Sequence, residues 1–407
     1  MIAVKLYQKS TKLFHVAYDV RGPALDEAAR MEAEGIRILK LNIGNPAPFG
    51  FRAPDAVLAR VRESIDSSQG YSDSPGLPAV REAIAAYHRG KGIQGVTPAD
   101  IYTGNGASDL IQLCMQGLLS PGDEILMPAP DYPLWTAAAT LAGGNVRHYI
   151  CDEQSDWMPD IQDMERKITP RNKAIVIINP NNPTGVVYSR EILEKIADLA
   201  RKHELILFSD EIYDRLCMDG VEHTSIAALA PDVFCITLNG LSKSHLIAGF
   251  RCGWMCLSGP KEPVKGYLEG IQILSNMRLC SNVPAQTVVL AALEDPYASR
   301  PLLLPGGRIY EQRETVCREL DKIDGISYIR PQAAFYVFPR VDAKRFGIVD
   351  DERFVLDFLR EQHVLLVRGG GFHWDEPDHF RIVYLPDVDT LTEAVRKLGV
   401  FLEHYRQ

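Results

Sequence analysis

The fold can be worked out from residues 234–251, which read FCITLNGLSKSHLIAGFR. The first five residues form a short apolar run that predicts a buried strand, and Lys243 follows it. Such a strand carries the amine into a site of low dielectric constant, where a charged ammonium group is disfavoured. An uncharged lysine is a nucleophile and a base, so this one is suited to forming a Schiff base with an aldehyde.

Arg251 follows Lys243 after a short interval and lies behind Gly249. Its guanidinium group can hold a phosphate through two parallel hydrogen bonds, and the glycine lets the backbone approach closely. Most lysines are solvated surface groups, so this pair alone is a weak indication of a site. The interpretation depends on the other segments.

Two polar segments each follow an apolar, strand-like run. Residues 179–185, NPNNPTG, follow the run at 173–178, and residues 209–213, SDEIY, follow the run at 205–208. Ligands of open α/β sheets bind at the carboxyl ends of the strands, so Asn182 and Asp210 are candidate ligand contacts. The alternatives are a turn residue for Asn182 and a helix N-cap for Asp210.

Residues 104–109, GNGASD, follow a predicted strand at 100–103 and open a predicted helix at 107–119. The free N–H groups and the positive dipole end of a helix start stabilise a phosphate, which makes Gly106, Ala107 and Ser108 candidates. The motif is not a dinucleotide fingerprint, because Asp109 stands where the third glycine belongs. A capping turn without a ligand is the alternative.

Composition excludes several classes of protein. The 407 residues exceed one typical core, which predicts two domains. The net charge of −9 argues against a nucleic-acid-binding surface. The eight cysteines lack metal-binding spacing and fit free thiols in a reducing cytoplasm. Neither a signal peptide nor an apolar run of about 18 residues, as a membrane span needs, is recognisable.

Alternating strand and helix signals predict an α/β fold. Further helices are expected at 24–34, 78–87 and 190–203, and further strands at 125–127, 146–151 and 252–257. A second unit is expected from residue 324, with strands at 327–329, 334–338, 364–367 and 379–384 and helices at 351–362 and 388–405. His373 and His379 lack a recognisable metal-ligand pattern, which predicts a solvated loop between them and no metal site.

In this order and at these separations, the motifs resemble the fold-type I, pyridoxal-phosphate-dependent aminotransferases of class I/II, over nearly the whole chain. Residues 19–23 (DVRGP), 41–51 (LNIGNPAPFGF) and 130–135 (PDYPLW) look more narrowly like the bacterial glutamate–pyruvate (alanine) aminotransferases. The resemblance implies a large domain with a mostly parallel sheet and a smaller α+β domain built from both chain ends. We expect an N-terminal arm with part of the small domain at 1–50, the large domain at 51–323 and the C-terminal small domain at 324–407.

The resemblance also implies roles for individual residues. Lys243 is the catalytic residue and binds pyridoxal 5′-phosphate. The other implied cofactor contacts are Tyr71, Gly106, Ala107, Ser108, Tyr132, Asn182, Asp210, Tyr213, Ser242 and Arg251. Tyr71 would reach the cofactor phosphate of the other subunit in a homodimer. The implied substrate contacts are Gly44, Asn182, Arg381 and Arg21. Gly44 would offer its backbone to the substrate carboxylate, Arg381 would bind the α-carboxylate and Arg21 the distal carboxylate of glutamate. Residues 369–372, GGGF, resemble a mobile loop over the site.

The expected reaction moves an amino group between L-alanine and 2-oxoglutarate by a ping-pong mechanism. Tyr132 and Trp135 are expected to limit the pocket to a small side chain. The alternatives are an aminotransferase for aromatic or branched-chain amino acids and a pyridoxal-phosphate-dependent β-lyase. A cofactor-binding transcription regulator would need a basic DNA-binding domain, for which the short leader leaves no room.

Overall fold

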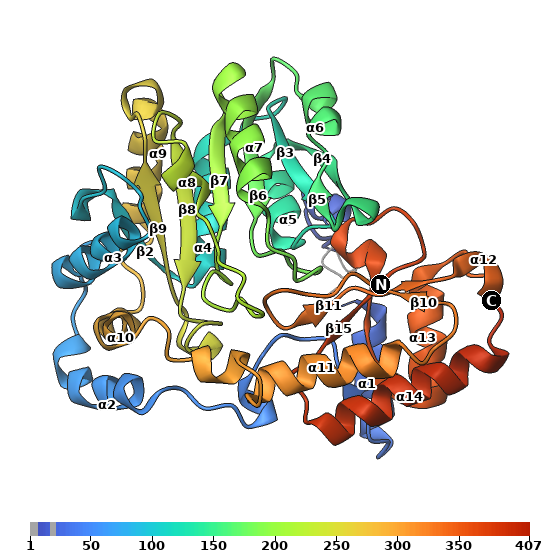
Figure 1. The fold of residues 1–407 in the computed structure, drawn as a ribbon. Helices are drawn as coiled ribbons and strands as arrows, with labels where there is room; N and C mark the ends of the chain where they lie inside the picture. Colours follow the sequence, from blue (N-terminus) through green and yellow to red (C-terminus); the bar gives the residue numbers. More distant parts are fainter. Residues whose placement is uncertain (1–6, 17–21) are drawn as a thin grey trace, which may run out of the picture.

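The computed structural model describes residues 7–16 and 22–407. Within these residues, eight strands form the central sheet, in the order β2-β9-β8-β7-β6-β3-β4-β5 (Figure 1). Strands β9 and β5 run antiparallel to their neighbours and the other pairs are parallel. The strands are β2 (Ile101–Asn105), β3 (Glu124–Ala129), β4 (Asn145–Asp152), β5 (Met158–Pro159), β6 (Asn172–Ile178), β7 (Ile206–Asp210), β8 (Cys235–Gly240) and β9 (Cys252–Ser258).

The central sheet is buried on both faces, which explains why its strands are continuous apolar runs. Alternate residues of β6 enter two different cores: Ile175 and Ile177 face one, whereas Val176 and Ile178 face the other. The first core is closed by α2 (Asp55–Ser64), α3 (Pro78–Gly90), α6 (Ile161–Lys167), α7 (Arg190–Lys202), α8 (Ile226–Leu229) and α10 (Val283–Glu294). The second is closed by α4 (Ala107–Leu118), α5 (Leu134–Ala142) and α9 (Lys265–Met277). The predicted α/β fold is confirmed.

The candidate residues meet at one edge of this sheet because of strand direction. Strands β2, β3, β6, β7 and β8 are mutually parallel, so the loops after them leave from the same edge. Strand β9 runs the opposite way, and its start, just after Arg251, therefore lies at that same edge. Segments far apart in the sequence are brought together in this way.

A second unit lies beside the sheet, drawn in orange and red in Figure 1 with blue α1 next to it. Its antiparallel sheet has the order β11-β15-β14, and a separate pair joins β1 to β13. The strands are β1 (Leu39–Lys40), β10 (Ile326–Ser327), β11 (Tyr336–Val337), β12 (Arg340–Val341), β13 (Val364–Leu365), β14 (Val367–Arg368) and β15 (Phe380–Val383). The helices are α1 (Pro23–Ala33), α11 (Arg308–Leu320), α12 (Ala343–Phe346), α13 (Asp351–Gln362) and α14 (Val388–His404). Since β1 pairs with β13, an early segment and a late one share this unit.

Two details differ from the expected elements. The strand expected at 364–367 is two strands, one pairing with β1 and the other with β15. The strand expected at 334–338 shortens to β11, because Ala334 has a positive φ of 64° that interrupts an extended backbone. Helix α11 shares its core with α14, so we propose that the C-terminal unit begins before residue 324, and the exact domain boundaries stay a prediction.

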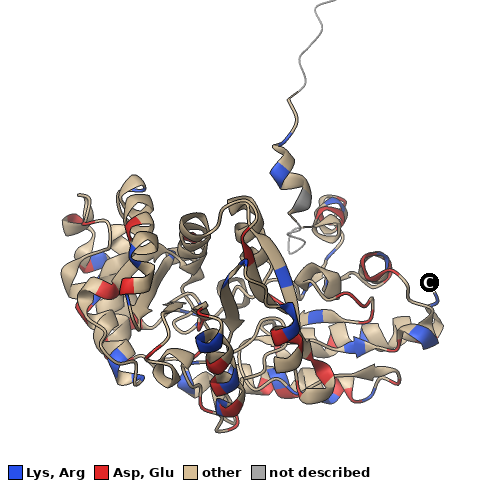
Figure 2. Cartoon of the chain, turned by 90° about the horizontal axis from the view of Figure 1, so that it is seen from above, with Lys and Arg blue, Asp and Glu red and all other residues tan. Residues whose placement is uncertain are grey.

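Charges are mixed on the surface. Figure 2 shows basic and acidic residues side by side on the same outer helices. Many of them pair within one helix, as Lys195 does with Glu191 at 2.7 Å. Among the helices of the described residues, none has the length and apolar character to cross a membrane.

Candidate active site

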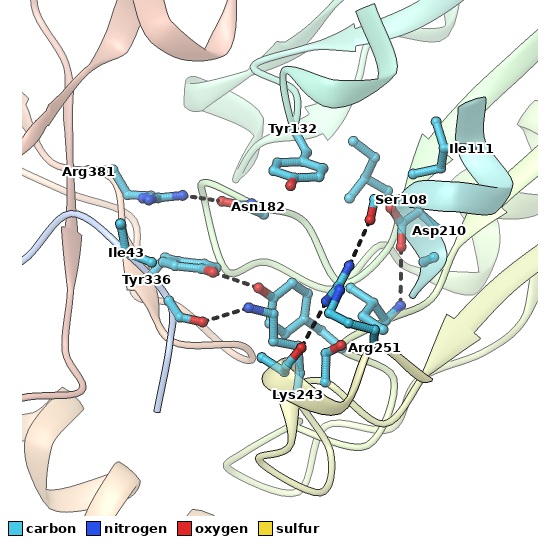
Figure 3. A pocket seen from close by; sticks show the side chains of 17 residues that line it. Ile43, Ser108, Ile111, Tyr132, Asn182, Asp210, Lys243, Arg251, Tyr336 and Arg381 are labelled. Atoms are coloured by element: carbon cyan, nitrogen blue, oxygen red, sulfur yellow. Dashed lines mark hydrogen bonds between the residues drawn. The ribbon is translucent and has the colours of Figure 1, made fainter. Parts of the chain in front are cut away.

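A cavity opens where the carboxyl edge of the central sheet faces the second unit (Figure 3). The empty space of the cavity, including its open mouth, is about 880 Å³, and residues from both units line it. Most predicted site residues line it: Gly44, Ala107, Ser108, Tyr132, Asn182, Asp210, Tyr213, Ser242, Lys243, Arg251 and Arg381. The sequence therefore identified residues that the fold brings together.

Lys243 stands just past the end of β8 and projects into the cavity. It is only partly buried, because one side of its chain faces the cavity space. Its Nζ atom donates a hydrogen bond of 2.6 Å to the carbonyl oxygen of Gly44. The amine thus points towards the loop that follows β1, across the cavity from its own strand.

An anion site lies at the start of α4. Gly106 is the N-cap of this helix and has a positive φ of 81°, which favours glycine. A side chain there would also overlap the guanidinium of Arg251, so both the backbone and the available space favour glycine. Arg251 donates to the hydroxyl of Ser108 at 2.9 Å and to the carbonyl of Asn105 at 3.3 Å. The helix start, a serine hydroxyl and an arginine fork therefore converge, which suits a phosphate.

Asp210 ends β7 and is almost fully buried, with 4% of its surface exposed. Its described donors are neutral: the indole Nε1 of Trp135 at 3.0 Å and the backbone N–H of Ile212 at 3.3 Å. Burial raises the pKa of Asp210 to about 6, and the bonds from Trp135 and Ile212 act in the opposite direction. A cationic partner would stabilise the ionised carboxylate, and the cavity is the place from which one can reach it.

The expectation that Trp135 limits the substrate pocket is wrong. Trp135 has 0% exposure and does not line the cavity, because it turns under the sheet edge into the core with Phe208. Its indole serves Asp210 instead. The closeness of Trp135 to Tyr132 in the sequence did not reveal this orientation. Trp135 lies in α5, which begins at Leu134, and successive side chains of a helix point to different sides.

Arg381 on β15 forms the opposite wall of the cavity and is 2% exposed. Its guanidinium donates to the Asn182 side-chain oxygen at 2.9 Å and to the carbonyl of Asn42. The group lies 4.4 Å from the ring centre of Tyr336 and 4.7 Å from that of Phe372. Aromatic faces hold a desolvated cation in place, so this arginine presents a fixed fork for a carboxylate.

Tyr336 is a lining residue that the sequence reasoning missed. Its hydroxyl lies 2.6 Å from that of Tyr213, and a side chain at Gly44 would overlap it. Burial alone raises the pKa of Tyr336, but nearby Lys243 and Arg381 outweigh it and hold the pKa below its ordinary value. The pKa of Tyr213 is raised, by burial and by Tyr336. The only indication in the sequence was that Tyr336 falls inside the predicted strand 334–338, and this alone does not show that its side chain lines the cavity.

The remaining expected residues and loops lie outside the cavity or outside the described residues, or differ from the expectation. Tyr71 is 82% exposed and does not line the cavity of its own chain. Arg21 lies outside the described residues. The loop at 369–372, expected to lie over the site, forms a 3-10 helix, η10 (Gly369–Phe372), in which Gly369, Gly371 and Phe372 are buried. Between His373 and His379, Asp375 and Glu376 are exposed, as expected for a solvated loop, whereas His379 itself is buried.

Comparison with known proteins agrees with this geometry. The family model for aminotransferase class I and II matches residues 36–398, and the chain therefore belongs to this family. Its members depend on pyridoxal 5′-phosphate and exchange amino groups between amino acids and 2-oxo acids, so this chain is a transaminase of fold type I.

Individual relatives are similar over almost the full length. The glutamate–pyruvate aminotransferase AlaA of Haemophilus influenzae is 55% identical, covering 99% of this chain and all of that protein. The alanine aminotransferase of Mycobacterium bovis is 50% identical, covering 99% of this chain and 94% of that protein. A crystal structure of an aminotransferase from Escherichia coli superimposes with a TM-score of 0.98 at 54% identity, covering 99% of this chain and 100% of that chain. The expected family and fold are confirmed.

Proposed function

We propose that this aminotransferase moves the amino group between L-alanine and 2-oxoglutarate, forming pyruvate and L-glutamate by a ping-pong mechanism. The names of the relatives at 50–55% identity support this substrate pair. One observation carries the proposal: Lys243 and Arg381 face each other across one cavity, with the Arg251 anion site and buried Asp210 beside them.

The residues present fit pyridoxal 5′-phosphate. The phosphate would lie at the start of α4, held by Ala107, Ser108 and Arg251, while Tyr132 covers one face of the ring. Asp210 would pair with the ring nitrogen, which accounts for an ionisable group kept in a nearly dry place with neutral donors only. Asn182 and Tyr213 would meet the phenolic oxygen. When bound, the cofactor supplies an aldehyde carbon that links to amines and a ring that accepts electrons.

The side chains would then share the work as follows. Arg381 binds the α-carboxylate of the amino acid as a bidentate fork, and the backbone of Gly44 and the amide of Asn182 lie beside it. Lys243 would hold the cofactor by its aldehyde carbon. When not so engaged, its amine would act as a positioned general base that holds or moves a proton at the substrate Cα. The Lys243 Nζ atom already points to the substrate side of the cavity, since it donates a hydrogen bond of 2.6 Å to the carbonyl oxygen of Gly44, and this orientation supports the role.

Substitution of Lys243 tests the mechanism. Lys243→Ala should lose borohydride-reducible attachment of the cofactor together with turnover, while the protein stays folded. Turnover at the native rate in this variant would refute the assignment. A panel of amino donors against pyruvate and 2-oxoglutarate tests the substrate pair, because aromatic or branched donors preferred over alanine would favour another aminotransferase. Pyruvate and ammonia released without a keto-acid acceptor would favour a β-lyase.

We also propose a homodimer with shared sites, working in a reducing cytoplasm. All eight cysteines are free thiols, which suits such a compartment. Large apolar side chains are exposed on one segment of α9 and after it, namely Ile273, Met277 and Leu279, and Tyr71 is exposed too. The hydrogen bond of 2.6 Å from Ser74 to Asn276 joins the Tyr71 segment to this region. A patch of this kind favours an interface.

Mixing two inactive variants tests the shared site. A hybrid of Tyr71→Ala and Lys243→Ala subunits has one site with an intact lysine and an intact partner tyrosine. Unfolding and refolding the two variants together should therefore restore part of the activity. No recovery from the mixture, when each variant refolds alone to a dimer, would reject the contribution of Tyr71 across the interface.

A further inference from the structure

The turn that carries Tyr132 is tied to the loop before β15 through its neighbour Asp131. The Asp131 carboxylate is fully buried and accepts hydrogen bonds from His373 Nδ1 at 2.6 Å and from the Thr136 hydroxyl at 2.7 Å. The backbone N–H of Asp131 also donates to the carbonyl of Phe372 at 2.9 Å. Asp131 therefore joins the Tyr132 turn to η10 by its side chain and by its backbone.

The same loop reaches Arg381 on its other side. Phe372 is fully buried, and its ring centre lies 4.7 Å from the Arg381 guanidinium. The backbone of Gly369 is bonded to the carbonyl of His379 at 2.8 Å, which places the loop against the beginning of β15. A continuous path of contacts thus runs from Tyr132 through Asp131, His373 and Phe372 to Arg381.

A second histidine completes the cluster. His148 on β4 lies 3.0 Å from the Thr136 hydroxyl, and its ring stacks on that of His373 with centroids 4.7 Å apart. Burial alone raises the pKa of Asp131, but the bonds from His148 and His373 outweigh it and lower the pKa below its ordinary value. The carboxylate is therefore stabilised in its ionised form, as a strong acceptor.

The cluster brings three possible metal-ligand side chains close together, but its geometry does not suit an ion. Asp131, His148 and His373 bring their ligand atoms within 4.8 Å of one another. The two imidazole planes, however, are stacked at only 19°. A ring nitrogen binds a metal in the plane of its ring, and two nearly parallel stacked planes do not share one such point. The cluster is better described as a hydrogen-bonded tie.

We propose that Asp131 and His373 are positioning residues that hold Tyr132 and the Arg381 fork at a set separation. This inference rests on the proposed roles of Tyr132 at the cofactor ring and of Arg381 at the substrate carboxylate. The proton-transfer geometry at the substrate Cα depends on both, because the ring fixes one end of the substrate and the fork fixes the other. The tie acts through Tyr132 and Phe372 and does not itself touch the reacting atoms.

The first test removes the donor while keeping an aromatic ring. In His373→Phe, the dissociation constant of pyridoxal 5′-phosphate and the KM for amino acids should both rise about ten- to a hundredfold, as expected for a lost hydrogen bond to a buried carboxylate. The value of kcat should change far less. Circular dichroism of the bound cofactor gives a readout of ring orientation that does not depend on turnover.

Two variants serve as matched controls. His373 has a positive φ of 58°, which strains a bulky residue, and His363 has the same backbone conformation at 60° at the end of α13. His363→Phe carries this strain away from the site and should leave both constants unchanged. His373→Asn tolerates the left-handed conformation and keeps a donor near the Nδ1 position, so it should stay within about threefold of the wild type.

A double variant shows whether the two residues act as one unit. Since Asp131→Asn and His373→Phe disturb the same bond, their combined effect on the cofactor dissociation constant should be smaller than the product of the single effects. Multiplied effects, or a His373→Phe enzyme with native constants and native circular dichroism, would overturn the inference. If the inference is overturned in this way but Lys243→Ala is inactive, the proposed function still stands. If Lys243→Ala is active, the proposed function itself is refuted.

Discussion

Replacing Trp135 by phenylalanine isolates what one buried N–H group does for Asp210. The indole donates at 3.0 Å to a carboxylate that is 4% exposed, and its effect is to lower the pKa that burial raises to about 6. A change from the ordinary value of 3.8 to about 6 corresponds to about 3 kcal/mol of disfavoured ionisation in the cofactor-free protein. Loss of the bond should increase this penalty by about 1.5–3 kcal/mol.

The sign of the pH dependence follows from a raised folded-state pKa. Asp210 contributes to the stability of the cofactor-free protein below its unfolded pKa of about 3.8, and this contribution is lost as the pH rises through about 6. Binding of a ring protonated at nitrogen needs the ionised carboxylate, so cofactor affinity should fall as the pH drops below about 6. In Trp135→Phe the larger penalty raises the pKa of Asp210 further, so this fall should begin at higher pH, and affinity at pH 7 should drop about two- to fifteenfold.

The assay is equilibrium dialysis of the protein against the cofactor between pH 5 and 8, and the absorbance of the bound cofactor measures the binding. Trp254→Phe is a matched control, because Trp254 is equally buried and donates at 2.9 Å to His88 rather than to Asp210. Both variants should lose stability in urea, but only Trp135→Phe should move the pH dependence of binding. An unchanged pH profile in Trp135→Phe, or the same movement in both variants, would refute the reasoning.

Other substitutions test other contacts. Arg381→Lys should raise KM for every amino acid about tenfold or more, since a point charge cannot reproduce the fork held between Tyr336 and Phe372, and a native KM in steady-state assays would contradict this. Gly44→Ala should strongly reduce turnover because its methyl group overlaps the Tyr336 hydroxyl, and adding Tyr336→Phe should restore part of it; no recovery would count against the overlap as the cause. Lys91→Met should lower the free energy of unfolding in urea by about 3–5 kcal/mol. It would leave Glu211 and Asp214 buried without the lysine that now lies 2.5 Å and 2.6 Å from them, and unchanged stability would contradict this.

Sequence reasoning worked for residues whose place depends on strand direction. The lysine after β8, the carboxylate at the end of β7, the amide after β6 and the helix start after β2 all lie at one edge, because parallel strands end there. The fold class could be predicted for the same reason, since buried parallel strands are continuous apolar runs. The structure shows which of these residues line the cavity, whereas the individual roles implied by the resemblance, including those of Tyr71 and Arg21, stay predictions.

Sequence reasoning failed where the answer depends on which way a side chain turns. Trp135 was expected to line the pocket and instead supports Asp210 from the core. Tyr336 was not selected, although it touches Tyr213 and stacks on Arg381. The glycine-rich loop at Gly369–Phe372 is packed between the Tyr132 turn and β15, a placement that its own sequence did not predict. These three depend on contacts between segments that are far apart in the sequence, by 75 residues for Trp135 and Asp210 and by more than a hundred for the other two.

By itself, the amino-acid sequence determined the order of strands and helices and the chemistry available at the strand ends, because periodicity and residue type are local properties. Only the tertiary structure decided which groups share a hydrogen bond, as Asp131 does with His373 and Asp210 with Trp135. The physical reason is that the burial of a side chain and its hydrogen-bond partners depend on segments that are distant in the sequence and exclude water together in the folded protein. Neither segment alone carries a signal of this.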